Sequence, residues 1–361
     1  MSLSRRNLIA AASATYLLAP LDRWHNRLHV GARRGAPAGG RGLPVRLLLN
    51  SGFAGPQAYF FLAQQRGYLR DAGVDVEFVA GDGAAAVVPR MAQEGFDACY
   101  GDLNALIALA ALRRAEAPLA VYVAFNTTPL TIGVAANGPV HTPRDLEGRV
   151  VGGHPMDAAL EVFPAYAAAA GIEARRVSVM RSPTSMSNLA QDAMAGRTAG
   201  VFGFVHTIVA ALAGSGIDGR RALRFLEYRE FLPELYGNAL IVSQQFIRAH
   251  PAEVAAMVRA VNRGLRDTVN NQAAAIEALV AIAPTVRRDV DGPRLAGTIA
   301  VEMAHPEGKT FGVGNVDPAR LVRAIERIAG NGRLPRVPTA DEIFTDRFLP
   351  PVAERLTTLA R

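Results

Sequence analysis

Cysteine is nearly absent from this sequence of 361 residues. The single cysteine, Cys99, forms no intramolecular disulfide and is too few for a zinc cluster. Since none lies near the N-terminus, we expect no lipid anchor. No apolar run after the N-terminal region reaches the length of a membrane-spanning helix, so we expect a soluble body. A Walker loop, a nucleophile-elbow motif and a metal-spaced histidine pair are also lacking, so we expect no metal or cofactor.

Acidic residues are scarce at the N-terminus, and this imbalance accounts for most of the net charge of +7. Residues 1–43 contain seven arginines and one aspartate, a local charge of +6 that leaves the rest of the chain near +1. The residues concerned are Arg5, Arg6, Arg23, Arg27, Arg33, Arg34 and Arg41, against Asp22. A nearly neutral body has no electrostatic surface for a polyanion, so we expect no nucleic-acid partner.

The first residues read as an export signal. A basic start at Arg5-Arg6 is followed by an apolar segment from Ala10 to Leu21, as in signal peptides. The paired arginines after Ser4 resemble the twin-arginine signal. Ala36-Pro37-Ala38 has the small residues of a cleavage site. We therefore expect residues 1–38 to be a twin-arginine-type signal peptide and the mature protein to be periplasmic.

From Pro44 onward, short β-rich runs alternate with helical ones, which is typical of an α/β fold. The pattern predicts a first lobe over residues 44–126 and a second over residues 130–228. The chain then returns to the first lobe over residues 237–361, which also holds the C-terminal helices. Two linkers, residues 126–129 and 228–236, would lie side by side, and this double crossover is typical of a hinge.

Three segments resemble a known family. They are Arg66–Glu77 (RGYLRDAGVDVE), Thr142–Gly152 (TPRDLEGRVVG), and Leu235–Asn238 (LYGN) followed by Pro251 and Arg259-Ala260. They are similar to segments of the substrate-binding proteins of ABC importers, in the NMT1/THI5-like branch near the aliphatic-sulfonate and taurine binders. The resemblance implies a type II periplasmic binding fold, a ligand held between two lobes, a membrane permease as partner, and a monomer.

The sequence departs from the family's thiamine-pyrimidine binders after the first strand. Those members carry a tryptophan-proline-asparagine stretch with a histidine, where this chain reads Asn50–Pro56 (NSGFAGP). The cysteine-rich motif of the eukaryotic pyrimidine synthases is absent as well. The resemblance therefore leaves a pyrimidine-type ligand as one candidate among others.

The loops that follow the strands are the expected ligand site, because ligands of open α/β sheets bind beyond the carboxyl ends of the strands. Polar and aromatic residues there suit a small molecule, and a helix N-terminus suits an anionic group. The predicted ligand-binding residues are Asn50, Ser51, Phe53, Tyr59, Asp82 and Asp102 in the first lobe, Asn126, Thr127 and Tyr228 at the hinge, and His154, Asp157, Ser182, Ser185 and Phe204 in the second lobe.

Several hypotheses for function stay open. The first is a binding protein for a pyrimidine-like or other heteroaromatic solute. The second is the same kind of binding protein with an alkanesulfonate or carboxylate ligand, whose anionic group pairs with Arg181. The third is an enzyme on the same fold, as the resemblance allows, with Cys99 and His154 as the first residues to suspect. The fourth is a sensor that reports its ligand to a membrane partner. We favour a transport protein without catalytic residues.

Overall fold

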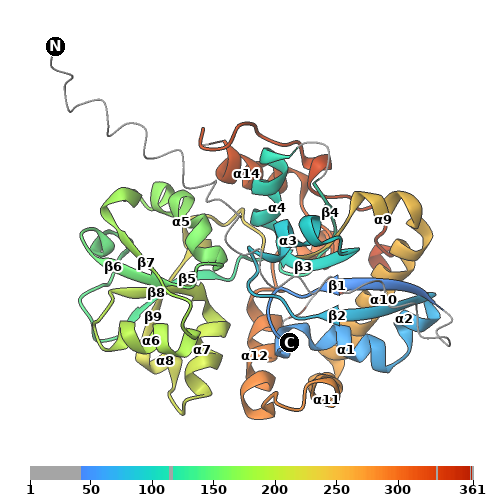
Figure 1. Cartoon of the computed structure of the whole chain (residues 1–361), viewed down its shortest axis with the longest axis horizontal. Coiled ribbons are helices and arrows are strands. Elements are labelled where there is room, and N and C mark those ends of the chain that lie inside the picture. Colours follow the sequence, from blue (N-terminus) through green and yellow to red (C-terminus); the bar gives the residue numbers. More distant parts are fainter. Residues whose placement is uncertain (1–41, 114–116, 331, 358, 360–361) are drawn as a thin grey trace, which may run out of the picture. The chain divides into compact units, whose positions relative to one another are not determined.

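The computed structural model describes residues 42–113, 117–330, 332–357 and 359. The predicted signal peptide, residues 1–38, lies outside the described residues. Two five-stranded sheets, each covered by helices, make up the described chain (Figure 1). The predicted α/β fold with two lobes is therefore confirmed.

The first lobe is built on a mixed sheet in the order β2-β1-β3-β10-β4. Its strands are β1 (Leu43–Leu48), β2 (Val74–Val79), β3 (Ala98–Asp102), β4 (Leu119–Val123) and β10 (Asn238–Val242). Strand β1 runs parallel to β2 and β3, whereas β10 is antiparallel to β3 and β4. The carboxyl ends of β1, β2 and β3 therefore meet at one edge of the sheet. The return of β10 to this sheet confirms the prediction for Asn238–Val242.

The second lobe repeats the arrangement in the order β7-β6-β8-β5-β9. Its strands are β5 (Leu130–Ala135), β6 (Val150–Gly153), β7 (Ser178–Arg181), β8 (Gly200–Phe204) and β9 (Leu223–Glu227). Strand β6 is parallel to β7 and β8, and β5 is antiparallel to β8 and β9. The carboxyl ends of β6, β7 and β8 thus form the corresponding edge of this sheet.

Helices cover both faces of each sheet. Those of the first lobe are α1 (Ala58–Gln65), α2 (Tyr68–Asp71), α3 (Val87–Glu94), α4 (Leu103–Leu112), α9 (Gln244–Ala249), α10 (Pro251–Asn270), α11 (Gln272–Ile282), α12 (Arg288–Val301), α13 (Gly308–Phe311) and α14 (Pro318–Ala329). Those of the second lobe are α5 (Ala158–Ala169), α6 (Met186–Met194), α7 (Val205–Ala213) and α8 (Gly219–Ala222). Apolar residues of α1 and α10 form one core of the first lobe, and those of α3, α4 and α14 form the other. Within the described residues, none of these helices is both long and apolar enough to cross a membrane.

Two crossovers connect the lobes and lie against each other. The first joins β4 to β5 and the second joins β9 to β10. The amide of Gly237 donates to the carbonyl of Phe125 at 3.0 Å, which links the crossovers directly. A Cβ on Gly237 would lie 2.8 Å from the Cδ of Pro129, so only glycine allows this close approach.

The buried arginine Arg320 of α14 fastens both crossovers. Its guanidinium donates to the carbonyl of Asn126 at 2.7 Å, in the first crossover, and to that of Leu235 at 2.9 Å, in the second. The same group pairs with Glu307 at 2.6 Å and lies 4.0 Å from the ring centroid of Tyr236. The sequence alone did not reveal this contact, because it joins residues far apart along the chain.

The sequence pattern also predicts one helix over residues 57–72 and another over residues 292–303. The first prediction is wrong, since Gly67 adopts a left-handed φ of 78° that separates α1 from α2. The helix expected over residues 292–303 begins four residues earlier, at Arg288. This extension places Pro293 inside α12, in its second turn, where proline has no N–H to donate to the carbonyl four residues earlier.

Candidate functional site

A pocket of about 320 Å³ lies between the two lobes, and we call it the interlobe pocket. The loops after β1 and β2 and helix α12 line it from the first lobe, and the loops after β6, β7 and β8 line it from the second. Its lining residues are Asn50, Ser51, Asp82, Gly83, Ala84, His154, Met156, Asp157, Ala158, Pro183, Thr184, Ser185, Met186, Phe204, Thr207 and Arg294. The carboxyl ends of parallel strands thus face each other across the pocket, as ligand sites of open sheets do.

Polar groups of the first lobe are held in place by a buried glutamine. The side-chain amide of Gln57 donates to the Oδ1 of Asn50 and, at 3.2 Å, to the Oγ of Ser51. In the loop after β2, which lines the same pocket, the side chain of Asp82 is exposed and pairs with Arg90 at 3.1 Å. The first lobe therefore offers a fixed amide, a hydroxyl and a carboxylate.

The second lobe presents helix caps to the pocket. The carboxylate of Asp157 accepts from the amide of Ala159 at 2.8 Å and caps α5. The hydroxyl of Ser185 accepts from the amide of Asn188 at 3.2 Å and caps α6. His154 accepts from the amide of Met156 through Nδ1 at 3.3 Å and lines the pocket.

The lobes touch on two sides of the pocket. On one side Gly83, with a positive φ of 154°, lies so close to the second lobe that a Cβ there would be 2.5 Å from the carbonyl oxygen of Met156. The neighbouring Ala84 packs into the apolar core of the second lobe. On the other side Arg294 of α12 donates to the Oγ1 of Thr207 at 2.8 Å. Figure 1 shows α12 next to α7 in this region.

Two carboxylates, one from each lobe, lie near each other at the pocket: Asp102 is buried behind it, and Asp157 is half-buried in its lining. The pKa of Asp102 is raised to about 6, chiefly by burial and also by the charge of Asp157, while hydrogen bonds from Asn104 and Ala105 lower it. Burial also raises the pKa of Asp157 to about 6. The Oδ2 of Asp102 is buried and has no hydrogen-bond partner within the described residues. Burial therefore favours the protonated form of both groups, and for Asp102 the charge of Asp157 in the other lobe adds to this effect.

Seven of the fourteen predicted residues line the interlobe pocket. They are Asn50, Ser51, Asp82, His154, Asp157, Ser185 and Phe204. All lie in the loops that follow β1, β2, β6 and β7 or at the end of β8. The rule that ligands bind beyond the carboxyl ends of strands therefore brings together side chains from both lobes.

The other seven predicted residues lie elsewhere. Tyr59 is fully buried, with its ring 4.4 Å from that of Phe60. Tyr228 is also fully buried, stacks on Tyr166 at 4.0 Å and donates to the carbonyl of Ala159. These two rings belong to the hydrophobic cores of their lobes.

Hinge residues and loop neighbours complete this second group. Asn126 donates to the carbonyl of Met303 at 3.1 Å and Thr127 to that of Ala304 at 3.4 Å, so both fasten the crossover. Phe53 packs edge-on against Phe61. Asp102 caps α4 behind the pocket, and Ser182 accepts from the amide of Thr184 within its own loop.

Arg294 is one of the lining residues that the sequence did not indicate. It stands on a helix near the C-terminus and not on a loop after a strand, and only the fold brings it to the pocket. By contrast, Arg181, the arginine that the sequence suggested for an anion, is exposed and pairs with Glu161 at 3.2 Å.

A model of the family described as NMT1/THI5 like matches residues 56–275. The chain belongs to this family. The match includes the crossovers and the second-lobe wall of the pocket, whereas Asn50, Ser51 and Arg294 lie outside it. No curated protein matches the sequence well enough to count as a relative.

Several solved structures share the fold of this chain. The alkanesulfonate-binding protein SsuA from Xanthomonas axonopodis pv. citri has a TM-score of 0.63 at 17% identity, with 84% of this chain and 99% of that chain covered. The periplasmic aliphatic sulphonate binding protein SsuA from Escherichia coli has a TM-score of 0.61 at 13% identity, with 87% and 97% covered. A DszB mutant in complex with biphenyl-2-sulfinic acid has a TM-score of 0.54 at 14% identity, with 85% and 98% covered. They establish the periplasmic binding protein fold for this chain.

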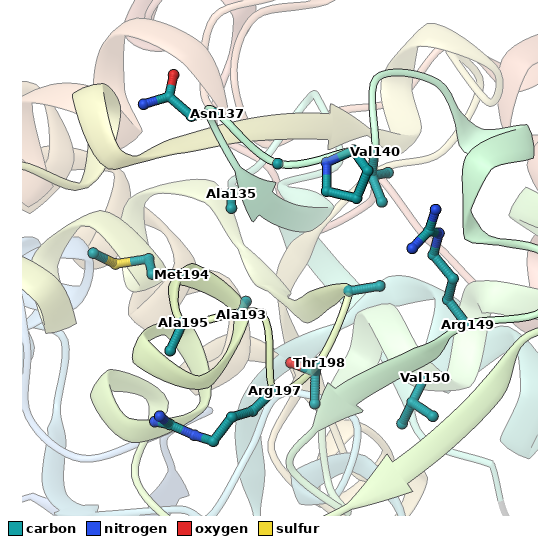
Figure 2. Close-up of a pocket in the computed structure, with 14 residues that line it drawn as sticks. Ala135, Asn137, Val140, Arg149, Val150, Ala193, Met194, Ala195, Arg197 and Thr198 are labelled. Carbon is teal, nitrogen blue, oxygen red and sulfur yellow. The ribbon is translucent and has the colours of Figure 1, made fainter.

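A larger cavity, of about 480 Å³, lies within the second lobe of this NMT1/THI5-like chain (Figure 2). It is lined from Ala135 to Val140, at Arg149 and Val150, and from Ala193 to Ala199. Its two arginines are already engaged, Arg149 with the carbonyl of Asp145 and Arg197 with the carboxylate of Asp192. This cavity opens at the amino ends of β6 and β8 and involves one lobe only. The interlobe pocket is therefore the better candidate for the functional site.

Proposed function

We propose that this protein captures a small organic molecule between its lobes and delivers it to the permease of an ABC importer. The observation that carries the proposal is the interlobe pocket, where strand ends of both lobes place polar groups around one space. A ligand that contacts both lobes stabilises the arrangement in which they touch, since it binds that arrangement better than a separated one. Membership of the NMT1/THI5-like family supports the same role.

The walls of the pocket suit a solute with an apolar ring or chain. Phe204, Met156 and Met186 line it together with the polar caps. An aromatic face and thioethers pack well on flat heterocycles. We therefore keep a pyrimidine-like or other heteroaromatic ligand as the leading class, and an alkanesulfonate or carboxylate as the alternative.

Calorimetric titration tests this function. The panel consists of thiamine-type pyrimidine precursors, riboflavin, small aromatic acids and alkanesulfonates. The proposal expects saturable one-to-one binding of at least one compound, reduced when Phe204 is replaced by alanine. The absence of heat from every compound would refute these ligand classes.

We further propose that the protein acts in the periplasm as a monomer and is exported by its N-terminal twin-arginine-type signal. The paired Arg5-Arg6 and the following apolar segment support this route. N-terminal sequencing of protein from the periplasm should find a start near Gly39. An intact Met1 on that protein would contradict export with cleavage.

An enzyme that uses Cys99 as nucleophile is the weaker alternative. Cys99 lies fully buried in β3, and burial raises the pKa of its thiol far above the usual range. A nucleophilic cysteine needs a thiolate within reach of substrate and of an acid-base partner. Turnover of a bound compound that is lost in Cys99→Ser would restore this alternative.

A further inference from the structure

Helix α12 of the first lobe lies along α7 of the second. At the start of α12, the guanidinium of Arg287 donates to the carbonyl of Gly214, the C-cap residue of α7, at 3.1 Å. Seven residues further along α12, Arg294 donates to the hydroxyl of Thr207 near the start of α7. The contacts thus run in opposite directions along the two helices. The lobes therefore meet through an antiparallel helix pair.

A glycine allows the closest approach of this pair. A Cβ on Gly297 of α12 would lie 2.3 Å from both the Cδ2 and the Nε2 of His206 in α7. Glycine is less favourable than alanine inside a helix, but here it makes room for the imidazole of the other lobe. At Gly292 of the same helix a Cβ would meet open space. The contact between the helices therefore depends on the absence of a side chain at residue 297.

Next to this glycine, a buried carboxylate of one lobe accepts a hydrogen bond from the other. His206 and Glu302 are 6% and 2% exposed, and the Nδ1 of His206 lies 2.5 Å from the Oε1 of Glu302. The Nε2 of His206 lies 2.8 Å from a guanidinium nitrogen of Arg220 in α8. Since arginine only donates, this Nε2 accepts and the Nδ1 donates to Glu302. The Oε2 of Glu302 is buried without a hydrogen-bond partner in the described chain.

The other charges of α12 do not replace this donor. Burial lowers the pKa of Arg294, while the charges of Asp291 and Glu302 oppose this effect, so the guanidinium lies near both carboxylates. Its own hydrogen bond, however, goes to Thr207. Asp291 accepts from the amide of Gly55 in the first lobe. Glu302 is the carboxylate whose side-chain donor comes from the second lobe.

The end of α12 that carries Glu302 is also tied to the hinge. The carbonyl of Glu302 accepts from the amide of Thr127 at 2.9 Å, and the carbonyl of Met303 accepts from the side-chain amide of Asn126 at 3.1 Å. Both donors belong to the first crossover. A motion that separates α7 from α12 must therefore break the hydrogen bond between His206 and Glu302 while this end of α12 stays at the hinge.

We propose that α7 and α12 form a latch that holds the lobes together, in which Gly297 lets the helices touch and Glu302 stays buried only while His206 donates to it. The latch concerns how the lobes open and does not depend on which solute is captured. A buried carboxylate that loses its donor is unfavourable until water reaches it, so loss of His206 favours open lobes. A Cβ at Gly297 has the same effect, because it separates the helices.

Double electron–electron resonance on the full chain, dialysed free of small molecules, measures the separation of the lobes. Spin labels are attached through Ala168→Cys on α5 and Gln245→Cys on α9, which are exposed positions of opposite lobes. Cys99 is fully buried and stays unlabelled. We expect one short distance in the wild type. In Gly297→Ala a longer distance should dominate, with the ratio of open to closed chains increased roughly tenfold or more.

Two further comparisons separate the latch from general damage to α12. Gly292→Ala places the same side chain on the same helix and should keep the wild-type distance. His206→Ala should open the lobes, and the addition of Glu302→Gln should restore most of the closed chains, because it removes the buried charge that has lost its donor. Mere loss of packing at His206 would not respond to a change at Glu302.

Three results would overturn the latch. The first is a long distance in the wild type. The second is a Gly297→Ala distribution equal to that of Gly292→Ala. The third is a His206→Ala chain that stays open after Glu302→Gln is added. Thermal unfolding of each variant checks that the chain is folded, and the His206 series tests the latch even if Gly297→Ala does not fold.

Discussion

At the scale of single residues, two aspartates with the same local role differ in burial. Asp102 caps α4 with hydrogen bonds of 2.9 and 3.3 Å from two backbone amides, and Asp218 caps α8 with bonds of 3.1 and 3.3 Å. Asp102 is fully buried and Asp218 is exposed. Burial, joined by the charge of Asp157 from the other lobe, raises the pKa of Asp102, whereas its cap hydrogen bonds lower it.

Replacement of Asp102 by asparagine should stabilise the protein above pH 6. The folded state holds the proton of Asp102 up to about pH 6, whereas the unfolded chain loses it near 3.8. The folded state therefore binds more protons between these values, and the free energy of unfolding falls as the pH rises through this window. A shift of this size corresponds to about 1–3 kcal/mol. Asp102→Asn should be more stable by this amount at pH 8 and equal to the wild type below pH 4.

Urea unfolding at several pH values measures this effect. Asp218→Asn is the matched control, because it changes an exposed cap of the same geometry. A stability of Asp102→Asn that shows the wild-type slope between pH 4 and 6 would contradict the assignment.

Gly83 sets how closely the lobes approach. A Cβ at this position meets the carbonyl of Met156, and the positive φ is unfavourable for alanine. Gly83→Ala should weaken capture roughly tenfold, since strain of 1–3 kcal/mol opposes the contact between lobes. Native mass spectrometry measures the fraction of the chain that carries bound ligand. Gly52→Ala, where a Cβ meets open space, should leave that fraction unchanged. An equal ligand-bound fraction in both variants would show that the contact at Gly83 is irrelevant to capture.

At the scale of elements, α14 determines how the crossovers are held. Arg320 donates to carbonyls of both, and its partner Glu307 is nearly buried. Loss of one member of such a pair leaves a buried charge uncompensated. The element that fastens the hinge thus comes from the C-terminal part of the chain, far in sequence from the crossovers themselves.

Arg320→Met should destabilise the protein by about 3–5 kcal/mol, because Glu307 and the crossover carbonyls lose their donor. Thermal or urea unfolding measures the loss. Arg323→Met, an exposed position on the same helix, should change stability by less than about 0.5 kcal/mol. A loss of similar size in both variants would mean that α14 responds to any loss of charge and does not fasten the hinge through Arg320.

At the scale of the whole molecule, the sequence was informative where local rules apply. Alternation of strands and helices predicted both sheets, and strand ends predicted Asn50, His154 and Phe204 in one pocket. Periodicity does not show which way an aromatic ring points, so Tyr59 was predicted for the pocket and lies in the core. Arg294 reaches the pocket only through packing of α12 against α7, which no local pattern indicates.

A crystal structure of the protein with its captured ligand tests the central claim most directly. The account predicts one molecule in the interlobe pocket, in contact with Asn50 or Ser51 from the first lobe and with Phe204 from the second. A ligand seated in the cavity of the second lobe shown in Figure 2, or in contact with one lobe only, would contradict it.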